Sequence, residues 1–381
     1  METERTRVVV ICPWFYRGDA VGAAARETFI HLEATPDFEV SALWTVNDYD
    51  DVKGRKVEGL ADMLLNPFFL AADILIYVFA VHHPLFDAML IGNGRARQIV
   101  RFHNVTPKAL MPEKHWPVIE RSFVQMQNFA FADEIWADSQ ENLEELDRRG
   151  LGGPSTRIEP LAVHFHQRIL LDAKVSGTLT LLYVGRFFRS KGVLDLIRCA
   201  ALLRDRLNIS FRLRLVGNVR FSDPDYIQEI QRAIAAEALG DVVEFVGSVS
   251  DAELAQAYAD SHIFITGSRH EGFCVPVIEG LAASCIPVCY AISNLRFIGN
   301  SLGRAVRTDT PEGLAEAVAD IARASFSDLP TIGPVIAVDA GVFTLTQFES
   351  TVTAYLEQFT PENFGRRIRA RVLLLAVAPR L

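Results

Sequence analysis

One stretch of this chain decides the fold class that we expect, and it reads Ser268-Arg269-His270-Glu271-Gly272-Phe273-Cys274-Val275-Pro276-Val277-Ile278-Glu279. It follows the apolar run His262–Thr266, which is typical of a buried parallel strand. Pro276 suits the first turn of a helix that begins near Val275, and Gly272 permits close approach to the backbone. The N–H groups at this helix start point to one spot, where the helix dipole favours an anion.

Two carboxylates flank that helix start. Glu271 lies in the loop just before the helix, and Glu279 lies about one turn inside it on the same rim. Carboxylates beside an anion site suit a ligand that carries both phosphate and hydroxyl groups, as a nucleotide sugar does. The simpler interpretation makes Glu279 a solvated helix residue and Glu271 a helix cap.

A second loop between a strand and a helix reads Val184-Gly185-Arg186-Phe187-Phe188-Arg189-Ser190-Lys191-Gly192. Arg186 and Lys191 follow the carboxyl end of the strand, where open α/β sheets bind ligands. Two cations there would neutralise a diphosphate and support its departure as a leaving group. A basic loop that is merely solvated is the alternative. Gly217 ends the expected strand Arg212–Val216 and leaves room for a ligand at the next edge.

Apolar runs alternate with helical patterns along nearly the whole chain, which predicts two doubly wound α/β domains. We expect an N-terminal domain over residues 1–168, a C-terminal domain over 169–345, and a helix with a basic, apolar tail over 346–381. The expected strands are Arg7–Cys12, Phe38–Trp44, Ile74–Phe79, Gln98–Phe102, Glu134–Ala137, Leu179–Val184, Arg212–Val216, Val242–Val246, His262–Thr266 and Ile286–Cys289.

Composition narrows the class of protein. The 381 residues are 50% hydrophobic and carry a net charge of −9, which disfavours a nucleic-acid partner. Five cysteines, an odd number in or beside apolar runs, suit buried thiols in a reducing cytoplasm. We expect no secretory signal, and Leu60–Ala80 contains too many polar residues to span a membrane, so it predicts a core helix followed by a strand.

Taken together, these motifs closely resemble the retaining glycosyltransferases of family 4. The resemblance covers residues 179–320 and rests on Glu271 and Glu279, with seven residues between them, and on Gly185-Arg186…Lys191-Gly192. In the first half, Arg17-Gly18-Asp19-Ala20-Val21-Gly22 is similar to the Gly-rich loop of the family. Phe102-His103-Asn104-Val105-Thr106-Pro107 is similar to a box of bacterial polysaccharide and lipopolysaccharide members, many of them mannosyltransferases.

The resemblance implies the GT-B fold, in which two Rossmann-like domains face each other across a cleft and a C-terminal helix returns to the N-terminal domain. It implies that Arg186 and Lys191 hold the donor diphosphate, that Glu271 contacts the transferred sugar, and that Glu279 contacts the ribose. His103 would approach the donor sugar at the reacting centre. The remaining donor contacts would come from Gly18, Gly22, Gly217, Phe273, Cys274 and Val275. Cys274 stands where many members have Gly, and Gly280 stands where they have Ala.

The expected activity is a metal-independent, retaining transfer of a hexose, with mannose favoured. GDP-mannose would be the donor, and a glycan or lipid-linked glycan of the cell surface would be the acceptor. No cofactor or metal is expected, because Asp223-Pro224-Asp225 is typical of a helix N-cap rather than of a metal site. Retention would proceed by front-face attack, with the leaving diphosphate taking the acceptor proton. A nucleotide-sugar epimerase and an inactive, GT-B-like binding subunit are the alternatives.

Basic residues suggest contact with an anionic lipid surface. The window Ile91–Ser122 contains Arg95, Arg97, Arg101, Lys108, Lys114 and Arg121, and the tail contains Arg366, Arg367, Arg369, Arg371 and Arg380. We therefore expect a cytoplasmic protein, peripheral at the inner face of the cell membrane. The alternatives are that these charges are ordinary solvated ones and that the tail packs on the body of the protein.

Overall fold

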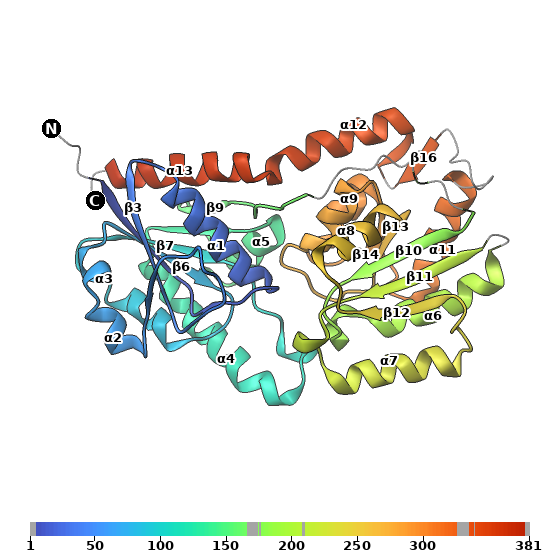
Figure 1. Cartoon of the computed structure of the whole chain (residues 1–381), viewed down its shortest axis with the longest axis horizontal. Helices are drawn as coiled ribbons and strands as arrows, with labels where there is room; N and C mark the ends of the chain where they lie inside the picture. Colours follow the sequence, from blue (N-terminus) through green and yellow to red (C-terminus); the bar gives the residue numbers. More distant parts are fainter. Residues whose placement is uncertain are drawn as a thin grey trace. The chain divides into compact units, whose positions relative to one another are not determined.

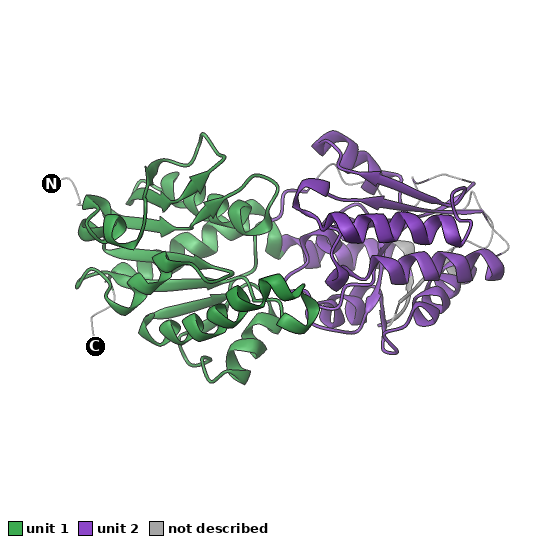
Figure 2. Cartoon of the chain, turned by 90° about the horizontal axis from the view of Figure 1, so that it is seen from below, with its two compact units in different colours: residues 1–162, 358–381 green, residues 163–357 purple. Residues whose placement is uncertain are grey.

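The computed structural model describes residues 5–165, 174, 177–207, 210–325, 335–338 and 340–377. The chain divides into two compact units (Figure 2). The first comprises residues 1–162 and 358–381, and the second comprises residues 163–357.

The first unit contains a parallel seven-stranded sheet with the order β5-β3-β1-β6-β7-β8-β9. A short parallel pair, β2 with β4, lies outside that sheet. The strands are β1 (Thr6–Ile11), β2 (Trp14–Phe15), β3 (Phe38–Trp44), β4 (Val46–Asn47), β5 (Gly54–Lys56), β6 (Ile74–Phe79), β7 (Arg97–Phe102), β8 (Glu134–Ala137) and β9 (Thr156–Ile158).

Helices cover both faces of this sheet, so successive residues of one strand enter different cores. On β1, Val9 and Ile11 belong to one core, Val8 to the core that includes α13, and Val10 to a third beside α1. This explains the unbroken apolar run of the strand.

The α-helices are α1 (Ala20–Glu33), α2 (Leu60–Leu64), α3 (Pro67–Ala71), α4 (Trp116–Gln125), α5 (Gln140–Arg148) and α13 (Pro361–Val377). The 3₁₀ helices are η1 (Pro84–Leu90), η2 (Lys108–Leu110), η3 (Glu113–His115), η4 (Met126–Phe131) and η8 (Glu357–Phe359), the last ending within this unit.

The second unit contains a parallel six-stranded sheet with the order β12-β11-β10-β13-β14-β15, and an antiparallel pair, β16 with β17. The strands are β10 (Leu179–Val184), β11 (Phe211–Val216), β12 (Val243–Gly247), β13 (Ile263–Thr266), β14 (Ile286–Tyr290), β15 (Arg304–Val306), β16 (Val335–Val338) and β17 (Gly341–Thr344). The helices are α6 (Val193–Arg206), α7 (Pro224–Ala236), α8 (Asp251–Ala259), α9 (Val275–Ala282), α10 (Leu295–Leu302), α11 (Pro311–Ser325) and α12 (Leu345–Leu356), with short 3₁₀ helices η6 (Arg189–Lys191) and η7 (Val219–Phe221).

The six-stranded order is that of a Rossmann-type sheet, because the chain winds outward from β10 in one direction and then resumes at β13 on the other side. The two adjacent strands β10 and β13 therefore flank the point where the order reverses. Ligands of such sheets bind at that point, beyond the carboxyl ends of the strands.

The predicted fold class is confirmed, since both units are doubly wound α/β structures with parallel sheets. Leu60–Ala80 contains two short helices before β6 rather than one core helix, because Asn66 caps a new helix whose first residue is Pro67. The five cysteines are free and buried, as expected. None of the helices among the described residues is long and apolar enough to cross a membrane.

The C-terminal segment is divided differently from the single stretch 346–381 that we expected. Helix α12 packs on α9 and β17 and belongs to the second unit. Only from Gln358 does the chain join the first unit, where α13 runs beside α1 (Figure 1). The boundary between the units lies at 162/163 rather than at 168/169. Phe364, Ile368 and Val372 of α13 are buried, so the described part of the tail packs on the body.

Candidate active site

Two loops of the second unit converge where the strand order reverses. One follows β10 and carries Arg186 and Lys191, and the other follows β13 and carries Glu271. Because β10 and β13 are adjacent and parallel, both loops leave the same edge of the sheet. The sequence predicted these loops separately, and the fold places them side by side.

Close backbone packing holds the two loops together. Gly192 has a φ of 62°, and a Cβ at this residue would lie 1.9 Å from the carbonyl oxygen of Gly267. Only glycine fits there, because a side chain would be both strained and in collision. Beside this contact, the N–H of Arg269 donates to the carbonyl of Ser190 at 2.7 Å.

Lys191 and Glu271 form an ion pair between the loops. Lys191 Nζ lies 2.7 Å from Glu271 Oε1, and the two side chains are 21% and 12% exposed. Neither group is therefore a freely solvated charge. Glu271 is not the N-cap residue of α9 either, because Cys274 occupies that position, and the Cys274 side chain makes no capping hydrogen bond.

Arg186 offers its guanidinium to solvent. It is exposed, lies 5.5 Å from the centre of the Phe188 ring, and has no ion-pair partner within the part of the chain that the structure describes. Its backbone is fixed, because the hydroxyl of Tyr183 donates to the Arg186 carbonyl at 2.8 Å. The neighbouring Arg189 differs, since it pairs with Glu229 on α7. Arg186 is therefore the cation of this loop that is available to an anionic ligand.

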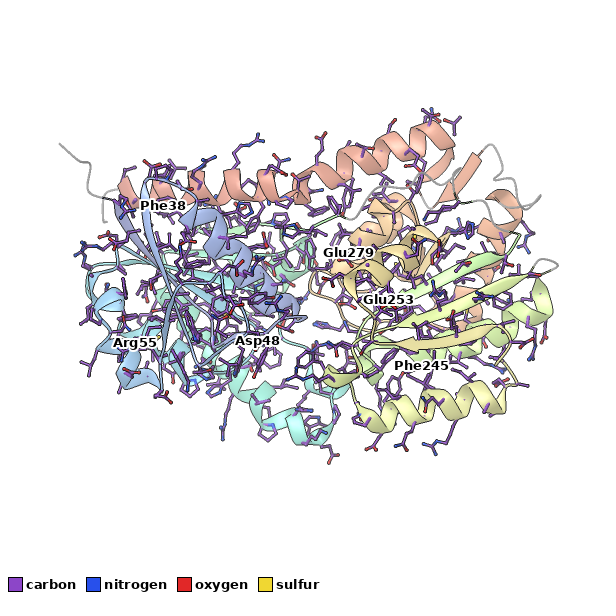
Figure 3. All side chains as sticks on the ribbon, viewed as in Figure 1. Phe38, Asp48, Arg55, Phe245, Glu253 and Glu279 are labelled. Carbon is purple, nitrogen blue, oxygen red and sulfur yellow. The ribbon has the colours of Figure 1, made fainter. Side chains whose placement is uncertain are left out.

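Glu279, which is labelled in Figure 3, lies on α9 and is held by a tyrosine rather than only by solvent. The hydroxyl of the buried Tyr258 donates to Glu279 Oε2 at 2.8 Å. Burial, together with the charge of Glu279, raises the pKa of Tyr258 well above its ordinary value, so the phenol keeps its proton. This contact fixes the direction of the Glu279 carboxylate on the same helix whose first residues follow Glu271.

The start of α9 has the geometry of an anion site. Cys274 adopts the left-handed conformation, with a φ of 69°. This explains why glycine suits that position in the resembling family, since glycine adopts such angles without strain. Neither the Cys274 nor the Val275 N–H donates to a backbone carbonyl within the described residues. The adjoining loop is anchored by Asn294, whose side chain donates to the Phe273 carbonyl at 2.8 Å.

In the first unit, His103 follows the carboxyl end of β7, as predicted. Its N–H donates to the Phe79 carbonyl at 2.9 Å. Asn104 then turns the chain with a φ of 75°, an angle that asparagine tolerates better than most residues. The Asn104 side chain donates to Asn142 on α5 at 2.8 Å, which secures the turn.

The side chain of His103 is bound by a carboxylate that we did not predict, that of Asp138. Nδ1 of His103 lies 2.5 Å from Asp138 Oδ2, and the side chains are 4% and 2% exposed. Asp138 also contacts the guanidinium of Arg101, which is fully buried. The other ring nitrogen, Nε2, is buried and has no hydrogen-bond partner among the described residues.

Backbone packing or backbone conformation explains the glycine at each of three positions that we predicted to contact the donor. A Cβ at Gly22 would lie 2.6 Å from backbone atoms of Tyr16, so glycine allows α1 to pack on the preceding segment. Gly18 is exposed and has a φ of 81°. A Cβ at Gly217 would lie 2.0 Å from the Gly185 carbonyl oxygen. Contact of these three residues with a donor stays a prediction.

Two Asp-x-Asp stretches, Asp223-Pro224-Asp225 and Asp48-Tyr49-Asp50, imitate a metal motif, and one aspartate of each has a structural role. Asp223 is the N-cap of α7 with Pro224 at the first position, as predicted, and Asp48 accepts from the Arg17 N–H at 3.2 Å. Among the described residues, no three histidine, cysteine or carboxylate side chains gather as metal ligands would.

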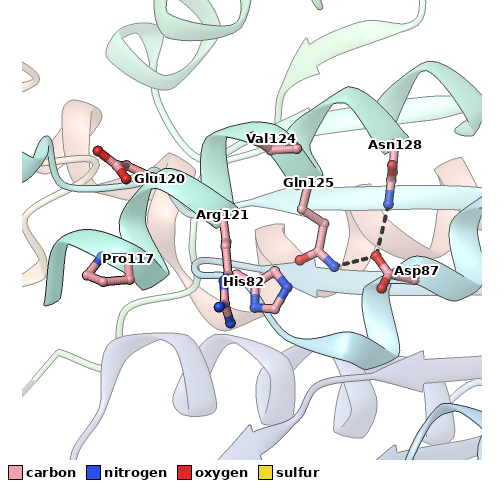
Figure 4. A pocket seen from close by; sticks show the side chains of 8 residues that line it. All are labelled: His82, Asp87, Pro117, Glu120, Arg121, Val124, Gln125 and Asn128. Atoms are coloured by element: carbon pink, nitrogen blue, oxygen red, sulfur yellow. Dashed lines mark hydrogen bonds between the residues drawn. The ribbon is translucent and has the colours of Figure 1, made fainter.

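A groove elsewhere in the first unit, with a volume of about 400 Å³, contains none of the predicted site residues (Figure 4). Gln125 and Asn128 both donate to Asp87 Oδ1, at 2.7 and 3.3 Å, so these polar groups satisfy one another. The lining residues are His82, Asp87, Pro117, Glu120, Arg121, Val124, Gln125 and Asn128.

Most of the basic residues that suggested a lipid surface are ion-paired. In the window 91–122, Arg95 pairs with Asp73, Arg97 with Asp133, Arg101 with Asp138, and Lys108 with Glu120. On α13, Arg367 pairs with Glu159 and Arg371 with Glu134. The local positive charge is thus smaller than the sequence suggests. Arg380 lies outside the described residues.

Comparisons with known proteins agree with this geometry. Residues 172–328 match the family model described as glycosyl transferases group 1. Over 154 residues the chain is 29% identical to a GDP-mannose:cellobiosyl-diphosphopolyprenol alpha-mannosyltransferase of Xanthomonas oryzae pv. oryzae, covering 40% of each chain. Over 194 residues it is 26% identical to an MMP alpha-(1->4)-mannosyltransferase of Mycolicibacterium hassiacum, covering 51% of this chain and 43% of that one. The chain thus spans about 40% of the length of these curated relatives.

Solved structures share the fold over nearly the full length. The sucrose-phosphate synthase of Thermosynechococcus elongatus superposes with a TM-score of 0.71 at 18% identity, covering 98% of this chain and 100% of that one. HepE of Anabaena, solved in complex with UDP-glucose, gives a TM-score of 0.67 at 13% identity, covering 96% and 99%.

The fold defines the class: this is a GT-B protein with two Rossmann-like sheets. Within it, residues 172–328 are similar to glycosyl transferases group 1, and the curated relatives include mannosyltransferases.

Proposed function

We propose that this protein is a glycosyltransferase that takes a hexose from a nucleotide-sugar donor bound to the second unit. One observation carries the proposal: the cations of one loop, the carboxylates Glu271 and Glu279, and the start of α9 meet at the point where the strand order of a Rossmann-type sheet reverses. A ligand with a diphosphate and hydroxyl groups matches that combination.

In this proposal, the exposed Arg186 and the start of α9 bind the diphosphate. Lys191 has three N–H donors, so it can hold a phosphate oxygen while it keeps Glu271. Glu271 then accepts hydrogen bonds from the transferred sugar, and Glu279, oriented by Tyr258, accepts them from the ribose. The positive groups stabilise the diphosphate as its charge grows during departure, which is where such contacts accelerate a reaction most.

Mannose is the sugar that we favour, with GDP-mannose as the donor and no separate cofactor. The support comes from the printed names of two relatives, which are both mannosyltransferases, one of them using GDP-mannose. We propose retention of configuration by front-face attack, with a glycan or lipid-linked glycan as the acceptor, as in cell-surface polysaccharide assembly. No observation favours the epimerase or the inactive binding subunit over this activity.

We also propose that the protein works at the cytoplasmic face of the cell membrane. Exposed apolar side chains of the first unit support this, namely Leu65, Phe68, Leu70, Leu90, Ile91, Val124 and Phe131. Arg121 and Lys114 near α4 have no ion-pair partner within the described ranges, so they remain available for lipid headgroups.

The proposal is tested by incubating the purified protein with a panel of nucleotide sugars and with polyprenyl-diphosphate-linked glycans as acceptors. Release of nucleoside diphosphate and a lengthened glycan are expected with GDP-mannose. Interconversion of two nucleotide sugars, without nucleoside diphosphate release, would favour the epimerase instead. Donor binding without any turnover, across all acceptors tried, would favour the binding subunit.

A further inference from the structure

Three ionisable side chains meet at the carboxyl edge of the first sheet. Strands β7 and β8 are parallel neighbours in which Phe102 pairs with Ala137, so the next residues, His103 and Asp138, leave the sheet side by side. Arg101 lies one residue before the end of β7 and reaches the same carboxylate. The contact of Asp138 with His103 is the shorter of the two, at 2.5 Å against 3.2 Å.

Arg101 determines the net charge of this cluster of three side chains. Its guanidinium is fully buried, donates to the Glu159 carbonyl at 2.9 Å, and lies 5.2 Å from the centre of the Phe364 ring. An arginine keeps its charge even when buried, so it needs an anion nearby. Asp138 supplies that anion, and the pair is neutral as a whole. His103 can therefore remain an uncharged imidazole beside it.

The carboxylate in turn fixes the tautomer of the imidazole. An ionised carboxylate only accepts hydrogen bonds, so His103 must carry its proton on Nδ1 in order to donate to Asp138. In a neutral ring the other nitrogen, Nε2, is then an acceptor with a lone pair. This Nε2 is buried and has no partner among the described residues, which is unfavourable unless something else donates to it.

We propose that Asp138, with Arg101 behind it, is the positioning residue that holds His103 in the Nδ1–H tautomer, so that Nε2 accepts a hydrogen bond from a hydroxyl of the sugar ligand. This inference rests on the proposed function, and it changes the chemistry that we expect of His103. A neutral His103 in this tautomer accepts a hydrogen bond at Nε2. It therefore cannot donate a hydrogen bond from Nε2 to the diphosphate.

Nuclear magnetic resonance of ¹⁵N-labelled protein tests the tautomer directly. Long-range ¹H–¹⁵N spectra distinguish a protonated ring nitrogen from one with a lone pair, and the His103→Gln variant identifies the His103 signals among the nine histidines. At neutral pH we expect Nδ1 protonated and Nε2 unprotonated. Adding GDP-mannose should shift the Nε2 resonance and leave Nδ1 protonated. A protonated Nε2 in the wild-type protein would overturn the proposal.

Asp138→Asn tests the positioning role, because the amide has the same shape but can donate to Nδ1 and so favour the other tautomer. Asp133→Asn is the matched control, since Asp133 precedes β8 at the opposite edge of the same sheet, where it pairs with Arg97. We expect Asp138→Asn to populate the Nε2–H form and to lower kcat at least tenfold, with the KM for donor within threefold, and Asp133→Asn to change neither. An unaltered tautomer and kcat in Asp138→Asn would overturn the role.

The two proposals fail in different ways. If the wild-type tautomer is as expected but no nucleotide sugar shifts Nε2 or is turned over, the proposed function is wrong and the role of Asp138 in holding the tautomer stands. If turnover occurs and Nε2 stays unaffected by donor, the hydroxyl contact is wrong. Should Asp138→Asn not fold, the wild-type spectra with and without donor decide both points.

Discussion

Lys191 and Glu271, 80 residues apart in the sequence, form an ion pair of 2.7 Å that connects the loops after β10 and β13. In the proposed function, Lys191 binds the donor diphosphate and Glu271 binds the transferred sugar, so the pair joins the two proposed donor contacts. If the donor binds as proposed, it meets two side chains whose directions the ion pair already fixes. Arg186 lies five residues before Lys191 and outside this ion pair, so Glu271 does not neutralise its positive charge.

The ion pair predicts that Lys191 matters for stability as well as for turnover. Lys191→Met should lower the free energy of unfolding by about 1–3 kcal/mol, because Glu271 is then left nearly buried without its cation. Adding Glu271→Gln should recover part of that loss, since the neutral amide needs no counter-charge. Denaturant unfolding of the two single variants and the double variant measures this coupling.

Arg186→Ala is the contrasting variant, because Arg186 is exposed and makes no ion pair within the described residues. It should unfold like the wild type. Its turnover should fall by roughly 10²-fold or more, and the turnover of Lys191→Met should fall by a similar factor. Equal destabilisation by both variants, or additive effects of Lys191→Met and Glu271→Gln, would show that the pair is not an energetic unit.

His103→Ala should affect chemistry more than folding. The Asp138 carboxylate keeps Arg101 as its partner in this variant, so no charge is left unpaired. We expect a melting temperature within a few degrees of wild type, donor affinity within about tenfold and turnover lowered by roughly 10²-fold or more. Calorimetry and steady-state kinetics check the three quantities. Full turnover, or an unfolded variant, would make His103 part of the scaffold.

Activity should survive chelation by EDTA. The proposed donor site contains cations and a helix start that can balance the charge of a diphosphate, and no metal-ligand cluster occurs in the described parts of the chain. Turnover in EDTA should equal turnover in buffer alone. Loss of activity on chelation, with recovery on adding Mg²⁺ or Mn²⁺, would replace this account with a metal-assisted one.

Membrane contact should depend on apolar side chains at least as much as on charge, because most basic residues of the first unit are ion-paired. We expect sedimentation with anionic liposomes to exceed sedimentation with neutral ones and to fall at high salt. Val124→Ser, at a residue 72% exposed on α4, should weaken binding, and Val219→Ser in the second unit serves as a control. Equal binding to both kinds of liposome would contradict the expected electrostatic contribution to membrane binding.

The longer strands of both units follow from patterns that are visible in the sequence, whereas the order of the strands in each sheet does not. Parallel strands covered on both faces favour unbroken apolar runs, and the run Ile74–Phe79 coincides with β6, all of whose residues are buried. Strand β5, by contrast, consists of three exposed residues, so nothing in its composition distinguishes it from a loop. At Pro361 the chain begins a new helix, because proline is well tolerated at a first helical position.

The loops of the candidate site were predictable one by one, whereas their partners were not. Arg186 and Glu271 each follow a strand, and that position alone indicates a ligand-binding edge. Their pairing through Lys191, and the bond from Tyr258 to Glu279, depend on which strands become neighbours. One sequence feature does indicate Asp138 as a site residue, because it directly follows β8 at the same edge of the sheet as His103.

The most direct test of the central claim, that the loop after β10 binds the donor diphosphate, is calorimetric titration of GDP into three proteins: wild type, Arg186→Ala and Arg189→Ala. The two arginines are exposed and three residues apart, but Arg189 is engaged by Glu229 while Arg186 is not. The account predicts that Arg186→Ala weakens GDP binding about tenfold or more, and that Arg189→Ala binds as the wild type does. Equal affinity of Arg186→Ala and wild type would contradict it.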